Sequence, residues 1–288
     1  MTVVYSTSGP YVLELETIDE TTSRGPAVRV TVSGVTTTTT FALTRLCEGR
    51  TETAPGWRAK QFIDTVVDTD WAAPTNRPIT YTLLVNGVVV AAATITLPSA
   101  YAWLQDPLQP DKCLKFTLTR DALGTAVLDA KSLKIFDYDK ANGALIPILG
   151  SSYPVAFGGQ RLESSRVTHR LRTFTVADAA AFRDLIRGAP ILLVRSLPAM
   201  VGLPALAYLN GNVTQEPFTT HLPGGHQQYW TVTGDIVAAV LQAAVTGSVT
   251  YDQVQQLLAG YTYDQVQTRA AATTYLDWQK NPLIFSTL

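Results

Sequence analysis

The feature that most constrains the fold is a strict alternation of apolar and polar side chains over the first hundred residues. The segments 28–33 and 79–85 both alternate with a period of two, which is typical of strands with one buried face. Asn86-Gly87 then separates the second segment from the apolar run 88–93, and this dipeptide is a strong signal for a two-residue hairpin turn. The pattern therefore predicts antiparallel β structure rather than a helical or α/β domain.

About seven such strands in about a hundred residues are typical of an immunoglobulin or fibronectin type III β-sandwich. We assign residues 1–98 to this sandwich. Tyr81 follows the Asn76-Arg77-Pro78 turn, at the place where such domains carry a tyrosine corner.

Residues 99–110 are bracketed and interrupted by Pro98, Pro107 and Pro110, so we expect a stiff, extended linker there. Trp103 lies within it, and we expect this side chain to be buried and to fix the angle between the domains on either side.

Residues 111–246 are predicted to form a second β-rich domain with one packed helix near 176–187. Thr175 with Asp178 forms a capping box, and Gly188 followed by Pro190 ends the helical stripe. Strands are expected at 114–118, 166–172, 191–194 and 228–233, and Asn142-Gly143 predicts a hairpin that joins 133–136 to 144–148.

Residues 247–288 are predicted to be a helical C-terminal arm. The hexapeptide Thr-Tyr-Asp-Gln-Val-Gln occurs at 250–255 and again at 262–267, and each copy can cap a short helix. Two short helices have too little volume for a core of their own, so the arm must pack on a neighbouring subunit or fold back on its own domain. Both alternatives remain open at the level of sequence.

Charge and composition argue against several classes of function. The 22 basic and 23 acidic side chains leave a net charge of -1, which gives no global attraction to nucleic acid or to an anionic membrane. The N-terminus lacks the pattern of a signal peptide, and no apolar run is long enough to span a bilayer. Cys47 and Cys113 have no metal or redox spacing and are expected to be reduced thiols.

Motifs for catalysis or metal binding are not evident, and we expect no enzymatic activity, no cofactor and no metal. His221 and His226 flank a turn without a cysteine nearby, which favours an ordinary loop. Arg166, Arg170 and Arg172 share one strand face, which is either solvated or an interface, the former being favoured. The five tryptophans are expected in cores or interfaces rather than in sugar-binding sites.

The order of these features resembles minor tail proteins of long-tailed phages (siphophages) that infect actinobacteria. The resemblance covers most of the chain, and its strongest elements are the Trp-Leu-Gln-Asp-Pro-Leu junction at 103–108 and the repeated C-terminal Thr-Tyr motif. It implies a structural component of the virion, assembled in the host cytoplasm, that forms a ring or collar at the distal tail tip. Its partners would be further copies of itself and other tail proteins, and it transfers no active-site residue.

Two further hypotheses remain. The same β domains could form a carbohydrate-binding adhesin that presents loops such as 217–228 to a host surface glycan, or a glycan hydrolase with a dispersed acidic pair. For the structural hypothesis, the candidate interface residues are Trp103, Arg166, Arg170, Tyr251, Leu257, Tyr263 and Trp278.

Overall fold

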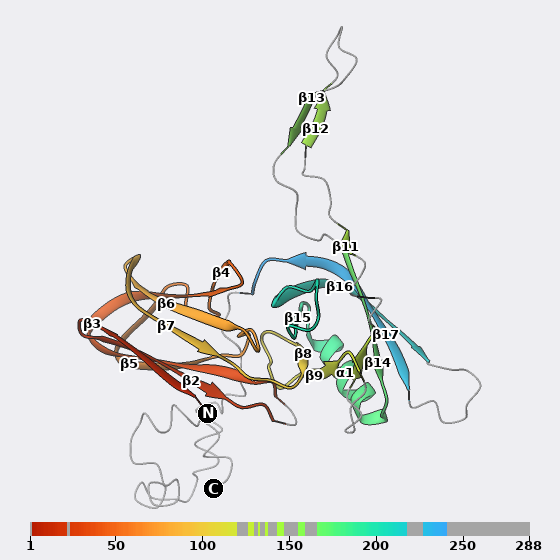
Figure 1. The fold of residues 1–288 in the computed structure, drawn as a ribbon, viewed down its shortest axis with the longest axis horizontal. Coiled ribbons are helices and arrows are strands. Elements are labelled where there is room, and N and C mark those ends of the chain that lie inside the picture. Colours follow the sequence, from red (N-terminus) through yellow and green to blue (C-terminus); the bar gives the residue numbers. More distant parts are fainter. Residues whose placement is uncertain are drawn as a thin grey trace, which may run out of the picture.

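The fold is that of a computed structural model of the whole chain (Figure 1). The structure describes residues 2–21, 24–119, 126–129, 132, 136–137, 143–146, 155–158, 166–217 and 227–240. These residues form a mainly β protein with a single helix in the described part, so the predicted fold class is confirmed. The arm predicted at 247–288 lies outside the described residues.

The N-terminal unit is built from seven antiparallel strands that belong to one sheet. They are β1 (Val3–Ser8), β2 (Tyr11–Ile18), β3 (Ala27–Cys47), β4 (Arg50–Thr53), β5 (Lys60–Asp70), β6 (Pro78–Val85) and β7 (Val88–Thr96). The long strand β3 takes part in two layers, because its first half pairs with β2 and its second half with β6. Two register shifts against β5, between Val32 and Thr39, mark the place where the strand changes layer.

The two layers enclose one hydrophobic core, as in a sandwich. Leu13, Leu15 and Val30 in one layer face Leu43 and Leu83 in the other, and all five are fully buried. The strand order differs from the immunoglobulin order, in which the second strand pairs with the fifth, because here β2 pairs with β3. The layers are thus those of a sandwich, with the chain passing from one to the other along β3.

The hairpin turn predicted at Asn86-Gly87 is confirmed. Asn86 and Gly87 both have positive φ and join β6 to β7 as a tight hairpin. Gly34, at the bend of β3, has φ +83°, and a Cβ there would lie 1.8 Å from the carbonyl oxygen of Pro10. Only glycine therefore fits this position without moving the backbone.

The second unit is a closed barrel. Its sheet runs β10-β9-β8-β15-β16-β17-β14-β11, and an additional pairing of β10 with β14 closes the ring. Its strands are β8 (Ala102–Gln105), β9 (Cys113–Thr117), β10 (Ala126–Leu128), β11 (Phe136–Asp137), β14 (Arg166–Thr173), β15 (Leu192–Arg195), β16 (Leu206–Pro217) and β17 (Gln228–Val237). Figure 1 shows this unit beside the sandwich.

The prediction of a linker over 99–110 is corrected by β8, which pairs with β9 and β15 inside the barrel wall. All four residues of β8 are buried. The prolines at 98, 107 and 110 lie on either side of this short apolar strand, so they delimit it and leave its backbone free to pair. The two units are therefore joined by only a few residues.

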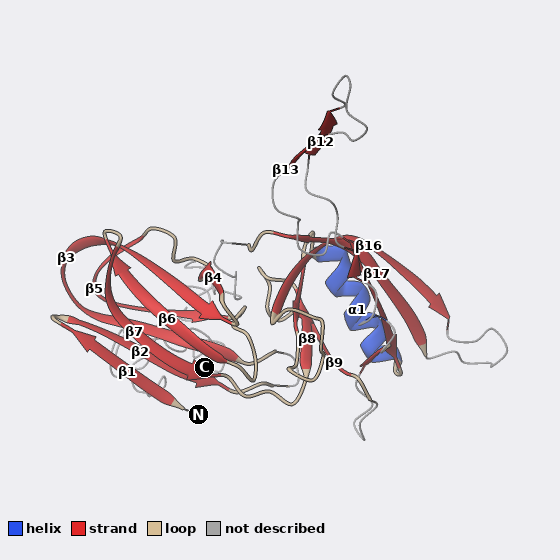
Figure 2. Cartoon of the chain, turned by 45° about the horizontal axis from the view of Figure 1, so that its top comes forward, coloured by secondary structure: helices blue, strands red, loops and turns tan. Residues whose placement is uncertain are grey.

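The helix α1 (Val176–Gly188) is confirmed at the predicted place. Its buried residues Ala179, Phe182 and Leu185 share a core with the barrel interior, and Figure 2 shows the helix lying against the barrel strands. Phe182 contacts Trp230 of β17 edge-to-face, with ring centroids 4.6 Å apart. The helix thus closes one side of the barrel core.

Thr175 caps the N-terminus of α1 as predicted, and its contribution to stability can be measured. The backbone N–H of Asp178 donates to Thr175 Oγ1 at 3.0 Å, and the Thr175 hydroxyl donates to the Asp178 carboxylate at 2.6 Å. We expect Thr175→Ala to lower the free energy of unfolding by about 1 kcal/mol, measured by urea denaturation. Thr36→Ala, at an exposed position, is the matched control, and equal losses in the two variants would show that the cap contributes nothing.

A hairpin stands apart from the barrel, and its pairing corrects a prediction. β12 (Gly143–Ile146) pairs with β13 (Val155–Gly158) as a separate two-stranded sheet, which extends away from the barrel in Figure 1. The predicted hairpin joining 133–136 to 144–148 is therefore wrong, since β11 pairs with β14 instead. Turn residues alone do not decide which strand a segment pairs with. In the part of the chain that the structure describes, no helix has both the length and the apolar character that a membrane-spanning segment needs.

Candidate functional site

The most distinctive polar feature is a set of buried arginines at the junction between the sandwich and the barrel. Arg45 arises from the alternation of β3, where it occupies an inward position between Leu43 and Cys47. Arg195 ends β15, directly after the apolar residues 192–194. Both guanidinium groups are almost completely buried, so each must find its partners within the protein.

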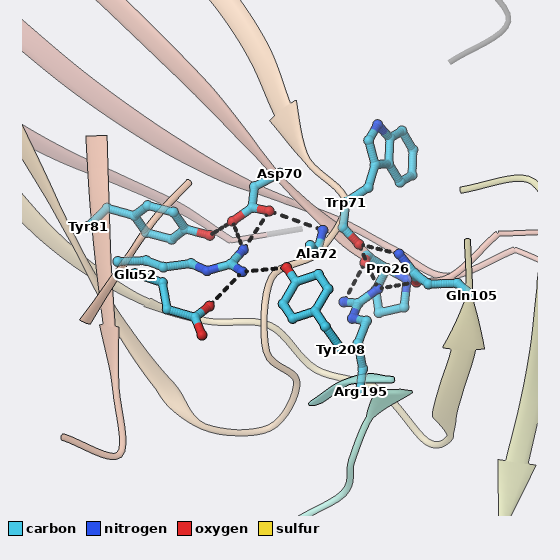
Figure 3. Close-up of polar contacts among 10 residues, drawn as sticks. Pro26, Glu52, Asp70, Trp71, Ala72, Tyr81, Gln105, Arg195 and Tyr208 are labelled. Carbon is cyan, nitrogen blue, oxygen red and sulfur yellow. Dashed lines mark hydrogen bonds and ion pairs between the residues drawn. The ribbon is translucent and has the colours of Figure 1, made fainter. Parts of the chain in front are cut away.

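Arg45 forms a bidentate ion pair with Asp70 at the end of β5. Arg45 Nη1 donates to the two carboxylate oxygens of Asp70 at 2.8 and 2.6 Å. The Tyr81 hydroxyl and the Ala72 backbone N–H also donate to this carboxylate, at 2.8 and 3.0 Å (Figure 3). Tyr81 therefore does not form the predicted tyrosine corner, because its hydroxyl binds a carboxylate rather than upstream backbone.

The same guanidinium reaches into the barrel unit. Arg45 Nη2 donates to the Tyr208 hydroxyl of β16 at 3.3 Å and to Glu52 at 3.2 Å. Burial alone lowers the pKa of Arg45, but its interactions with Asp70, Tyr208 and Tyr81 together more than offset this, and the pKa is raised well above its ordinary value. Burial raises the pKa of Tyr208, so this hydroxyl stays protonated. The cluster is thus one buried cation between two carboxylates, Asp70 and Glu52, next to the protonated hydroxyl of Tyr208.

Arg195 forms the reverse connection, from the barrel into the sandwich. Its Nη2 donates to the carbonyl of Pro26 at 2.7 Å, and its Nη1 donates to the carbonyl of Trp71 and to Gln105, both at 3.2 Å (Figure 3). Gln105 in turn donates to the Trp71 carbonyl at 2.9 Å. Burial lowers the pKa of Arg195 to about 10, which still leaves it charged at neutral pH.

A third arginine, Arg77, ties the turn before β6 to the barrel. Its Nη1 donates to the carbonyl of Ser196 at 2.7 Å, and its Nε donates to Glu48 at 2.6 Å. The Ser196 hydroxyl donates to the carbonyl of Pro204 at 2.7 Å, which fixes the loop that Arg77 binds. Three arginines therefore cross the junction, two from the sandwich and one from the barrel.

The predicted burial of Trp103 is confirmed, with 1% of its surface exposed. It packs at the junction, where a Cβ on Gly25 would lie 3.1 Å from Trp103 Cδ2 and 3.0 Å from Arg195 Nη1. The Trp103 indole donates to Ser99 Oγ at 3.0 Å. Whether Trp103 sets the angle between the units stays a prediction.

An apolar contact lies between the arginine clusters. Ala72 of the sandwich packs with Leu193, Leu206 and Tyr208 of the barrel in one small buried cluster. Oriented hydrogen bonds and dispersion contacts thus act together across the junction, and both resist sliding of one unit over the other.

Among the described residues, the charged groups at the junction bind one another and backbone carbonyls, and the nearest thiols are not activated. Burial raises the pKa of Cys47, and it raises that of Cys113 to about 11, so both thiols are protonated at neutral pH. Among the described residues, no group of three or more His, Cys, Asp or Glu side chains could hold a metal ion.

The predicted interface residues are only partly covered by the described structure. Arg170 lies on the outer face of β14, stacks on Tyr229 at 4.0 Å and pairs with Glu216 at 3.6 Å. For Arg166 only the backbone position in β14 is described. Tyr251, Leu257, Tyr263 and Trp278 lie outside the described residues, as do His221, His226 and most of the 217–228 loop.

The third histidine, His169, faces the barrel interior. It is 4% exposed and lines a small apolar cavity of about 10 Å³ together with Phe116, Leu171 and Val232. Neither of its ring nitrogens has a hydrogen-bond partner among the described residues. Burial lowers its pKa from 6.5 to about 4, so the ring is neutral at neutral pH.

Sequence reasoning missed the arginines that form the junction. The available signal was their position: Arg45 occupies an inward position in an alternating strand, and Arg195 directly follows four apolar residues. A charged residue at a core position predicts a buried partner, although it does not say which carboxylate or carbonyl that partner is. No protein-family model matches the chain, and no curated protein is significantly similar to it in sequence.

Proposed function

We propose that this chain is a structural subunit of a phage tail tip, where copies of it form a ring or collar with other tail proteins. The proposal begins from the resemblance of the sequence to minor tail proteins of siphophages. A ring subunit must keep one shape under load, because an error in the angle between its parts is repeated around the ring.

The observation that carries the proposal is the junction. The interface between two domains of one chain is often small and polar, and it allows the domains to move relative to each other. Here Arg45 and Arg195 are both buried. Arg45 of the sandwich donates to the Tyr208 hydroxyl of the barrel, and Arg195 of the barrel donates to the Pro26 carbonyl of the sandwich. The Arg45–Asp70 ion pair lies within the sandwich, so the bonds that sliding would break are those of Arg45 to the Tyr208 hydroxyl and of Arg195 to the carbonyls of Pro26 and Trp71. Breaking them is costly, because a buried charged donor is then left without its acceptor. The side chains at the junction therefore favour rigidity over chemistry.

The composition supports the same function. Only 16% of the residues are charged, against about 25% in an ordinary soluble domain. Low charge on the outside of a rigid body suits a subunit whose faces are covered by neighbours.

The test is to locate the protein in assembled phage particles. We expect mass spectrometry and cryo-electron microscopy of purified virions to find several copies in a ring at the distal end of the tail. We also expect the purified chain to self-associate and to show no turnover of cell-wall glycan. Absence from the virion, or glycan cleavage abolished by a single carboxylate substitution, would overturn the proposal.

A further inference from the structure

One outer face of the sandwich carries no charge, and its side chains are arranged in regular rows. It consists of the outward-facing residues of β4, β6, β7 and the second half of β3; we refer to it as the threonine face. Thr44 of β3 lies between Thr53 of β4 and Thr82 of β6, and Thr82 is in turn opposite Ala92 of β7. Alternation puts these residues on the side opposite the buried Leu43 and Tyr81.

The next row repeats this arrangement. Leu46 lies between Thr51 of β4 and Thr80 of β6, and Thr80 is opposite Thr94 of β7. The hydroxyls of Thr80 and Thr94 are 2.9 Å apart and hydrogen-bonded. Leu46 is 42% exposed, although it is a large aliphatic residue in the middle of a sheet.

The opposite face of the same sandwich is different. It carries Glu14, Glu16 and Arg29, and Arg29 Nη1 pairs with Glu16 at 2.6 Å. A solvated protein surface has about 25–35% charged residues, and the outer side of a half-exposed sheet is where they belong. The lack of charge on the threonine face is therefore a property of that face and not of the whole sandwich.

The character of the face selects its partner. A nucleic acid would need Lys or Arg, and a glycan would be expected to stack on aromatic rings, neither of which occurs on the threonine face. Its uncharged aliphatic groups and its hydroxyls, which both donate and accept, match a surface of the same kind. The threonine face itself is such a surface, and a net charge of -1 leaves little repulsion between copies.

We propose that a second copy of this chain docks on the threonine face, so that two sandwiches pack face to face about a two-fold axis. β3, β6 and β7 each present about four outward positions and β4 presents two. With strands about 4.8 Å apart and outward positions about 7 Å apart, the face covers roughly 500 Å². The pair then buries roughly 1,000 Å², which is at the lower limit for a specific interface. A pair held by this face alone is weak, with a dissociation constant in the micromolar range or above, and gains strength when several such contacts form in one assembly.

The experiment places a charge at the centre of the face. Thr82→Lys brings two ammonium groups into the uncharged interface of the pair, one from each copy, and Ala92→Lys does the same at the neighbouring, exposed position. Thr7→Lys, on the charged layer of the sandwich, is the matched control. We measure self-association of the full chain by sedimentation velocity over a concentration series, and check folding by circular dichroism.

We expect both face variants to raise the dissociation constant on the order of a hundredfold, while Thr7→Lys leaves it unchanged. Equal effects of Thr7→Lys and Thr82→Lys, or a folded Thr82→Lys that associates like the wild type, would overturn the proposal. This inference rests on the proposed function, because both require copies of the chain to self-associate. Self-association that is insensitive to Thr82→Lys contradicts only the docking face, whereas a wild-type chain that stays monomeric contradicts both.

Discussion

Asp70→Asn is expected to lower the free energy of unfolding by about 3 kcal/mol, because the buried guanidinium of Arg45 then loses its closest carboxylate and keeps only Glu52 as a counter-charge. Arg45 and Asp70 are each no more than 3% exposed, so water cannot replace the lost carboxylate. Asparagine has nearly the same shape, but its single amide oxygen can accept from only one of the two donors, the Tyr81 hydroxyl or the Ala72 N–H, and its NH2 group faces the other. The loss therefore reports the missing charge and acceptor and not a cavity. It is measured by guanidinium or urea unfolding at neutral pH.

Asp68→Asn is the matched control, two positions earlier in the same strand. Asp68 pairs with Lys60, and both side chains are about a quarter exposed, so we expect a loss of only about 0–1 kcal/mol. If Asp70→Asn costs no more than Asp68→Asn, the buried ion pair does not carry the role assigned to it.

A rescue separates the charge effect from general damage to the junction. Adding Arg45→Met to Asp70→Asn removes the buried cation that has lost its closest carboxylate, and we expect the double variant to be more stable than Asp70→Asn alone. We also expect the single variant to unfold the sandwich and the barrel in separate calorimetric transitions, since Arg45 links β3 to Tyr208 of the barrel. A double variant less stable than Asp70→Asn would contradict this account.

The elements with strong local signals could be predicted from the sequence. The alternating strands, the Asn86-Gly87 turn and the helix capped by Thr175 all depend on contacts close in sequence. The barrel closure could not be predicted, because it depends on the pairing of β10 with β14, about 45 residues apart, and strand pairing at that distance leaves no periodic signature. The prolines around β8 led to the wrong prediction of a linker, because proline occurs at the ends of strands as well as in stiff linkers.

The junction was less accessible to sequence reasoning. Burial of Trp103 follows from its size and apolar surroundings, and it was predicted. The pairing of Arg45 with Asp70 was not, since 25 residues and a change of layer separate them. Among the described residues Arg195 pairs with no carboxylate. It binds the carbonyls of Pro26 and Trp71, and because every residue carries a backbone carbonyl, such acceptors cannot be recognised from residue types in the sequence.

His169 is expected to make the barrel sensitive to acid. In the unfolded chain an imidazole takes up a proton near pH 6.5, whereas burial lowers the pKa of His169 to about 4 in the folded protein. Between these two values the unfolded state binds more protons, so the stability that is complete above pH 6.5 is lost as the pH falls toward 4. A difference of about 2.5 pKa units corresponds to about 3 kcal/mol.

His169→Phe isolates this contribution, because phenylalanine keeps a ring in the space between Phe116, Leu171 and Val232 but cannot take up a proton. Carboxylates elsewhere titrate in both proteins, so the difference between the two unfolding curves, followed by urea denaturation from pH 7 to pH 4.5, reports His169 alone. At pH 7 the variant should be as stable as the wild type or more so, since two ring nitrogens without a partner among the described residues are removed from the core. Below pH 6 its advantage should grow steadily. Parallel curves for the two proteins, or an NMR titration of His169 with a pKa near 6.5, would mean that the ring reaches water or a partner inside the barrel.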